Sequence, residues 1–202
     1  MPDAPAPPKV GKSTGAKILL YGGIALMVIG LAGYIGDWAA RNYELSQLLS
    51  QIETSEQAMT SAKDEIAAVT EALPEDPTDE QRDAATEKIE EIAQQNSALV
   101  AATGAQVAET SFLPWHNEML RAQTAYFAHN GAWVSYLDKG ASDAATLFND
   151  DNNIEPTWEA AKIAVPAAVP LGAWPTIQAR VDSIFSDDEQ PENPDAPPGL
   201  TA

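Results

Sequence analysis

The chain has 202 residues with 30 acidic and 11 basic side chains, a formal net charge of −19 at pH 7, and no cysteine. The charge is uneven, because three lysines and one aspartate lie before residue 37, which leaves 8 basic and 29 acidic residues, a charge of −21, beyond it. An anionic surface of this kind repels phosphate backbones and argues against nucleic acid as a partner. The lack of cysteine excludes disulfides, thiolate metal sites and lipid attachment through a thiol.

One segment near the N-terminus has the composition of a membrane-spanning helix. Residues Ile18 to Gly36 carry no charged side chain. At about 1.5 Å per residue this length roughly matches a hydrocarbon core of about 30 Å. The alternative is a cleaved signal peptide, whose apolar region spans only about 7–15 residues before a cleavage site with small residues. The exit from Asp37 to Arg41 offers no such site, so a retained single span is favoured.

The charges beside this span predict its orientation. Lys9, Lys12 and Lys17 precede it, and positive flanks stay in the cytoplasm. We therefore expect a single-pass protein of the cell membrane with a cytoplasmic N-terminus and an extracytoplasmic C-terminal part. The lipid bilayer is then its first partner.

Glycine is frequent in the span and lowers the helix surface, which lets a second membrane helix approach closely. The candidate residues for contact with a partner helix are Gly22, Gly23, Gly30, Gly33 and Gly36. None of these five residues are spaced as GxxxG, and glycine is common in membrane helices, so a surface without a specific partner is the alternative. The pattern favours integral membrane protein subunits as partners.

Both ends of the chain have the composition of disordered tails. Residues 1–17 are rich in proline and small residues, and residues 187–202 combine proline with acidic residues. Neither stretch has enough apolar side chains to build a core. We expect a disordered cytoplasmic tail and a disordered acidic tail.

A heptad pattern follows the span and predicts an antiparallel helical hairpin over residues 37–110. Its apolar positions are Trp38, Leu45, Leu48, Ile52, Met59, Ala62, Ile66, Val69 and Leu73, with Arg41 and Ser55 as interruptions. Pro74 and Pro77 end this helix, and Thr78 or Asp79 caps the next one. The second helix places Ala85, Ile89, Ile92 and Leu99 at helical spacing, interrupted by Asn96 and Thr103. A short polar connection favours adjacent antiparallel helices.

Aromatic residues mark a smaller helical region over residues 111–186. They are Phe112, Trp115, Tyr126, Phe127, Trp133, Tyr136, Phe148, Trp158, Trp174 and Phe185. We expect helices over 115–139, ended by Gly140, from Pro156 onward, and over 176–185, with the proline-broken stretch 163–174 buried. The rings are expected to form the core of this region; the alternative is a position near the bilayer, against the hairpin or a neighbour. The predicted fold class is all-α.

The sequence contains no recognisable catalytic or cofactor-binding motif. His116 and His129 lie thirteen residues apart, which on one helix separates them by about 140° and keeps them from sharing a metal ion. The polar run from Asn149 through Asp151 to Glu155 resembles a calcium loop, but it lacks the glycine and the twelfth-position glutamate of an EF-hand, and a helix-capping loop is the simpler interpretation. We expect no enzyme, cofactor, metal or small-molecule substrate.

The layout resembles the accessory single-span subunits of the actinobacterial respiratory supercomplex of cytochrome bc and aa3 oxidase. The resemblance consists of a short cytoplasmic tail, one span and an acidic extracytoplasmic domain rich in Ala and Asp. It implies a non-catalytic subunit that stabilises or connects larger membrane subunits and carries no haem or copper. The alternative is a single-span coiled-coil scaffold of the cell envelope or division machinery, which the heptad after the span would serve.

Overall fold

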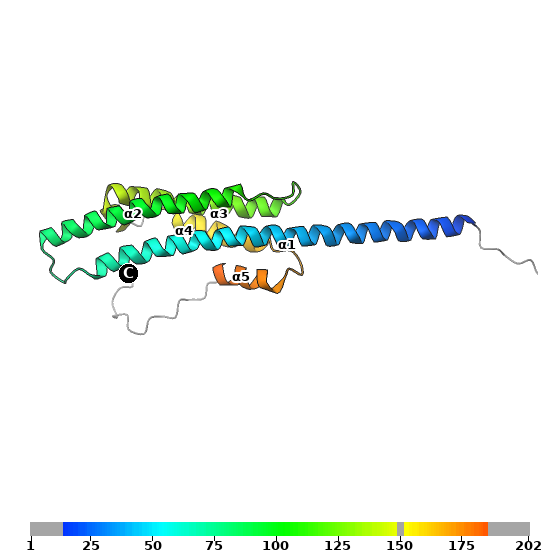
Figure 1. Ribbon diagram of the computed structural model, residues 1–202, viewed down its shortest axis with the longest axis horizontal. Coiled ribbons are helices and arrows are strands. Elements are labelled where there is room, and N and C mark those ends of the chain that lie inside the picture. Colours follow the sequence, from blue (N-terminus) through cyan, green and yellow to red (C-terminus); the bar gives the residue numbers. More distant parts are fainter. Residues whose placement is uncertain (1–13, 149–151, 186–202) are drawn as a thin grey trace, which may run out of the picture. The chain divides into compact units, whose positions relative to one another are not determined.

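The computed structural model describes residues 14–148 and 152–185, and every element in these ranges is helical (Figure 1). In chain order the elements are α1 (Thr14–Glu71), α2 (Asp79–Glu109), α3 (Asn117–Ser142), the 3₁₀ helix η1 (Ala144–Phe148), α4 (Ile154–Ala167) and α5 (Pro175–Phe185). The all-α prediction is therefore confirmed for the part of the chain that is described. The chain divides into two units, residues 1–40 and residues 41–202.

The predicted tails fall largely outside the described residues. Residues 1–13 and 186–202 are not described, nor are residues 149–151. Residues 14–17, which the composition assigns to the N-terminal tail, belong to α1. The helix therefore begins before the apolar segment, at Thr14.

In the second unit, α1 supplies the wall on which the other helices pack. Its buried apolar residues are Leu45, Leu48, Leu49, Ile52, Ala58, Met59 and Ala62. Leu49 and Ala58 lie outside the heptad positions, so the buried stripe is wider than a coiled-coil seam. The breadth has a physical cause, since residues of α2, α3, α4 and α5 all join the cluster around Leu45 to Ile52.

The start of α2 follows the capping chemistry expected from the sequence. The Thr78 hydroxyl accepts a hydrogen bond from the Gln81 amide at 3.2 Å, and the Gln81 side chain accepts one from the Thr78 amide at 2.9 Å. This reciprocal pair is a capping box, which satisfies two backbone donors that a helix start leaves unpaired. After the two prolines, the chain resumes as a helix at Asp79.

The buried face of α2 differs from the expected one at Leu99. That side chain is 49% exposed, while Val100 is fully buried together with Ile92, Asn96 and Thr103. Asn96 and Thr103, which were expected to interrupt the apolar face, lie in the interior. Both side chains are hydrogen-bonded there, Asn96 to the Ile92 carbonyl and Thr103 to the Ser55 hydroxyl. With them counted as inward, the face turns by one residue and Val100 replaces Leu99.

Helix α3 runs past the expected stop at Gly140. Its last residue is Ser142, so the prediction that Gly140 terminates the helix is wrong. A Cβ at Gly140 would lie 2.4 Å from a methyl carbon of Leu147 in η1. The glycine is therefore explained by close packing against the 3₁₀ turn and not by a positive φ angle.

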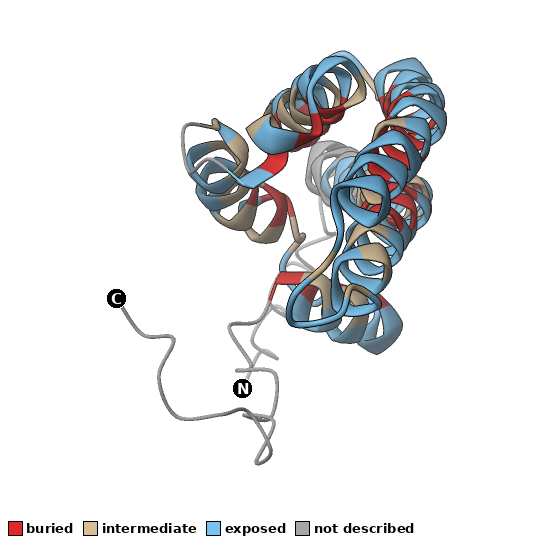
Figure 2. Cartoon of the chain, turned by 90° about the vertical axis from the view of Figure 1, so that its left-hand side faces the viewer, coloured by how far each residue is buried: buried red, intermediate tan, exposed pale blue. Residues whose placement is uncertain are grey.

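The aromatic residues do not build the core of the region after residue 111. Of these rings only Tyr126 and Phe185 are buried among the described residues, whereas Trp115, Phe127 and Phe148 are 47–61% exposed. The buried apolar residues are mainly aliphatic, and they lie on the faces where the helices meet (Figure 2). The expectation of a ring-built core is not confirmed. Leucine, isoleucine, valine and alanine from all five helices fill most of the interior, and Phe112, Trp158, Trp133 and Tyr136 pack against it while only partly buried.

The segment between α4 and α5 is only partly buried, which corrects the expectation that the whole stretch 163–174 is covered. Val165 and Ala168 are buried, but Ile163 is 73% and Leu171 is 93% exposed. The chain turns at Gly172, whose φ of 69° favours glycine. Leu171 is held outward at this turn.

A polar clamp joins α5 to α1 within the second unit. The guanidinium of Arg180 donates to both carboxylate oxygens of Glu53, at 2.7 and 2.8 Å. The same group reaches the Ser46 carbonyl and hydroxyl and the Ser50 hydroxyl at 3.0–3.2 Å. A two-pronged geometry of this kind fixes orientation as well as distance. It anchors the short terminal helix whose apolar face is Ile177, Val181 and Phe185.

Candidate functional site

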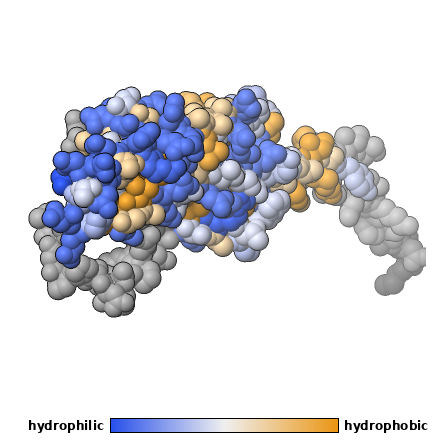
Figure 3. Space-filling model, turned by 60° about the vertical axis from the view of Figure 1, so that its left-hand side comes forward, coloured by the Kyte–Doolittle hydropathy of each residue, from blue (hydrophilic) through white to orange (hydrophobic). Residues whose placement is uncertain are grey.

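The most unusual surface of the chain is the apolar segment of α1. Its large side chains from Ile24 to Ile35 are 51–75% exposed, and no residue of the apolar window is buried. Figure 3 shows hydrophobic colour over this segment, whereas most of the remaining surface in that view is hydrophilic. Among the described residues this is the one helix long and apolar enough to cross a membrane, and it lies near the N-terminus.

The glycines of this segment lie on one side of the helix. At about 100° per residue, Gly22, Gly23, Gly30, Gly33 and Gly36 fall within an arc of roughly 140°. A Cβ at Gly23, Gly30, Gly33 or Gly36 would meet nothing within 4 Å, so these positions have room on the outside of the helix. Gly22 belongs to α1, but its surroundings lie outside what the structure describes. The result is a low strip beside exposed apolar side chains.

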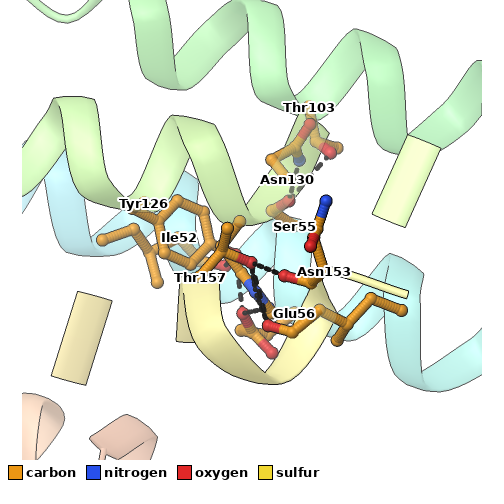
Figure 4. Close-up of polar contacts among 10 residues, drawn as sticks. Ile52, Ser55, Glu56, Thr103, Tyr126, Asn130, Asn153 and Thr157 are labelled. Atoms are coloured by element: carbon orange, nitrogen blue, oxygen red, sulfur yellow. Dashed lines mark hydrogen bonds and ion pairs between the residues drawn. The ribbon is translucent and has the colours of Figure 1, made fainter. Parts of the chain in front are cut away.

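The second unit contains a buried polar layer that joins three helices (Figure 4). The hydroxyl of Ser55 on α1 accepts hydrogen bonds from the Thr103 hydroxyl on α2, at 3.1 Å, and from the Asn130 amide on α3, at 2.6 Å. All three side chains are at most 4% exposed. Because an unpaired buried polar group is costly, a register in which these three side chains miss one another is disfavoured.

Gly104 makes room for this layer. A Cβ at Gly104 would lie 2.1 Å from the side-chain oxygen of Asn130. That oxygen belongs to the amide that bonds Ser55, so Asn130 has no space to retreat without losing the bond. The sequence offers a signal for Ser55 and Thr103, which break an apolar pattern, but none for Asn130 or Gly104.

A group of titratable side chains surrounds Glu56, the residue that follows Ser55 on α1. The Tyr126 hydroxyl donates to the Glu56 carboxylate at 2.8 Å, and His129 Nε2 lies 3.9 Å from the same oxygen. Burial raises the pKa of Glu56, against the opposing effect of the Tyr126 hydrogen bond, and burial also raises the pKa of Tyr126. Burial lowers the pKa of His129 to about 4, although its hydrogen bond to the Ile154 carbonyl works in the other direction. His129 is therefore neutral at pH 7.

The other histidine belongs to a different group. His116 precedes the first residue of α3 and its Nδ1 bonds Glu44 of α1, whose second oxygen accepts from the Leu113 amide at 2.8 Å. The two histidines are thus each joined to a glutamate of α1 and to a different turn of that helix. This contact ties the α2–α3 loop to the first turns of the second unit.

The described residues contain no group of three or more His, Cys, Asp or Glu side chains arranged to hold a metal ion. The predicted loop at Asn149–Asp151 lies outside these residues, so its calcium interpretation stays a prediction. The hydrogen bonds to Glu44, Glu56, His116 and His129 connect helices and loops of the same unit.

Comparison with family models, with curated proteins and with solved structures finds no match to this chain.

Replacing Gly104 with Ala tests the packing of the polar layer. We expect Gly104→Ala to lower the free energy of unfolding by about 1–3 kcal/mol, because the new methyl group displaces Asn130 from Ser55. Gly131 on α3 is the matched control, since a Cβ there meets nothing within 4 Å. Gly131→Ala should raise stability by up to about 1 kcal/mol through helix propensity. Urea unfolding in detergent measures both, and equal effects of the two substitutions would contradict the layer's role.

The buried His129 predicts a loss of stability in acid. Its folded-state pKa of about 4 lies below the ordinary value of 6.5, so the unfolded chain takes up a proton first as the pH falls. Stability is therefore lost from about pH 6.5 down to about pH 4, by about 3 kcal/mol from this group. The raised pKa of Glu56 acts with the opposite sign, because protonation of its carboxyl favours the folded state.

The comparison of His129→Gln with the unsubstituted chain isolates this effect, since all carboxylates are common to both. We expect the difference in unfolding free energy between the two chains to shrink as the pH falls from 7 to about 4. Urea titrations at several pH values, followed by tryptophan fluorescence, measure it. A difference that does not vary with pH would show that His129 is not buried in its neutral form.

Proposed function

We propose that this chain is a non-catalytic accessory or assembly subunit of a larger membrane protein complex, held by the span at residues 18–36. The observation that supports it most is the uncharged helical segment whose large side chains are 51–75% exposed. In water such a surface costs roughly 25 cal/mol per Å² of apolar area. In a bilayer that cost is removed, and the low glycine strip becomes a surface on which a second helix packs.

The proposal includes a direction across the membrane. Lys9, Lys12 and Lys17 precede the span and Asp37 follows it, so the positive-inside rule places the N-terminus in the cytoplasm and the acidic unit outside. The charge of −21 beyond residue 36 keeps that part soluble next to an anionic membrane.

We further propose that the extracytoplasmic part is an antiparallel hairpin with a smaller aromatic-rich helical region packed against it. The contacts between α1 and α2 support the hairpin: Ser55 bonds Thr103, and Ala58, Met59 and Ala62 share a cluster with Ile89 and Ala93. The stacked rings of Trp158 and Phe185, with centroids 5.1 Å apart, join α4 to α5 in the remaining region.

The same contacts weigh against the coiled-coil scaffold as an alternative. A scaffold would need the heptad after the span to face a second chain. Leu45, Leu48, Ile52 and Met59 are at most 1% exposed within one chain. Their burial leaves no apolar seam along this part of α1 for a partner coil.

The resemblance to accessory subunits of the actinobacterial respiratory supercomplex makes the host complex a testable choice. A chain tagged at the C-terminus is extracted gently from its native membrane and purified, and its partners are identified by mass spectrometry and by the haem absorbance spectrum. Recovery of integral membrane subunits in fixed ratio supports an accessory role, and oxidase subunits with haem support the supercomplex in particular. Recovery of this chain alone would contradict both.

The glycine strip predicts which substitution weakens that association. We expect Gly33→Leu to reduce co-purification of the partner subunits several-fold, because the leucine fills the space that a packed helix needs. Val28→Phe adds bulk about 140° away from Gly33 around the helix and is the matched control. Equal yields with both variants would show that the strip makes no specific helix contact.

A further inference from the structure

Two loops of the second unit are each hydrogen-bonded to the same turn of α1. The α2–α3 loop is joined there by the Leu113 amide, which donates to Glu44 at 2.8 Å, and by His116. The α4–α5 loop is joined by the Trp174 amide, which donates to the Asn42 side chain at 2.9 Å. Asn42 and Glu44 are two residues apart, on different sides of the same turn of α1, so both loops lie at one end of the unit, as Figure 1 also shows.

This end has no charge in either loop, which is unusual for such an acidic chain. Residues 110–116, between α2 and α3, contain no Asp, Glu, Lys or Arg, and neither do residues 168–174, between α4 and α5. Beside the loops, Arg41 lies 3.6 Å from Glu118, and Glu44 is bonded by His116 and by the Leu113 amide. An uncharged surface can be transferred out of water without the free-energy cost of burying an unpaired charge.

Large apolar side chains project from the same loops. Trp115 is 59%, Leu171 is 93% and Trp174 is 40% exposed. Leu120, one turn into α3, and Tyr43, beside Asn42, are 54% and 59% exposed. Five of the large exposed apolar residues of the second unit thus belong to the loops and to the helical turns next to them.

The covalent chain determines what lies close to this end. Only five residues separate Asn42 from Gly36, the last residue of the apolar segment. Even if this stretch were fully extended, Asn42 would lie no more than about 20 Å from Gly36. The headgroup region that follows the hydrocarbon core is roughly 5–8 Å deep on each side. Tryptophan and tyrosine are the side chains that favour this region, because their rings are apolar and their N–H or O–H groups are polar.

We propose that the two loops form a membrane-contact surface, comprising Trp115, Leu171 and Trp174, that rests in the headgroup region of the bilayer entered by the same chain. The tip of the surface is Leu171, which the turn at Gly172 holds outward. The contact gives the extracytoplasmic unit a defined height and tilt over the membrane. This inference rests on the proposed span, since without it the loops have no bilayer nearby.

The chain has no cysteine, so single labelling sites can be introduced without removing native ones. Three variants of the full chain are made: Leu171→Cys at the loop tip, Leu26→Cys in the span and Ile163→Cys on α4. Leu26 and Ile163 are 73% exposed, so both report an outer surface. Each carries a nitroxide and is reconstituted alone in phosphatidylcholine nanodiscs, and power-saturation EPR compares collisions with oxygen, which concentrates in lipid, and with a nickel chelate, which stays in water.

The result expected is a graded series. The label at Leu26 is open to oxygen and closed to nickel, the label at Ile163 shows the reverse, and the label at Leu171 has a nickel accessibility several-fold below that at Ile163. A label at Leu171 as accessible to nickel as that at Ile163, with Leu26 in the hydrocarbon, overturns the membrane contact but not the span. Protection of Leu171 only after partner subunits are added would also overturn it in favour of a protein contact. A label at Leu26 that meets nickel freely overturns the span and the membrane contact together.

Discussion

The constraint on which the architecture depends is the exposed apolar surface of α1 before residue 37. A helix satisfies its own backbone hydrogen bonds, so it can enter hydrocarbon without leaving polar groups unpaired. Its side chains supply the remaining condition, because none from Ile18 to Gly36 is charged. The part of the chain after this segment carries a net charge of −21. In the proposed topology a boundary between two solvents divides the chain after Gly36, close to the division between the two compact units at residues 40 and 41.

After residue 40, α1 supplies the wall of a packed unit. Leu45 to Ile52 form one core with residues from four other helices, while Ala58 to Ala62 form another with α2, α3 and η1. The polar layer at Ser55 lies between these two cores along α1. Apolar packing tolerates sliding between helices, but the hydrogen bonds of Ser55, Thr103 and Asn130 hold for one register only. The layer therefore contributes specificity where the apolar clusters contribute most of the free energy.

The sequence predicts elements whose causes are local and misses those whose causes are tertiary. The capping box at Thr78, the prolines after α1 and the apolar periodicity of α5 depend on neighbouring residues, and their helices begin and end within a few residues of the expected positions. Gly140 has the local mark of a helix end, yet it serves a contact with Leu147. Leu99 has the local mark of an inward residue, yet Asn96 and Thr103 take the interior. Asn96 bonds the Ile92 carbonyl of its own helix, and Thr103 bonds Ser55 of α1, a partner that no spacing rule reveals.

The central claim is that the apolar segment remains in the protein and in the membrane. Extraction of native membranes at alkaline carbonate pH, followed by the intact mass of the extracted and retained chains, tests it most directly, because peripheral and secreted proteins are released and single-span proteins are not. The account predicts a chain that stays with the lipid and has a mass that includes residues 18–36. A released chain that begins after this segment would mean that the helix is a cleaved signal, and it would contradict the account.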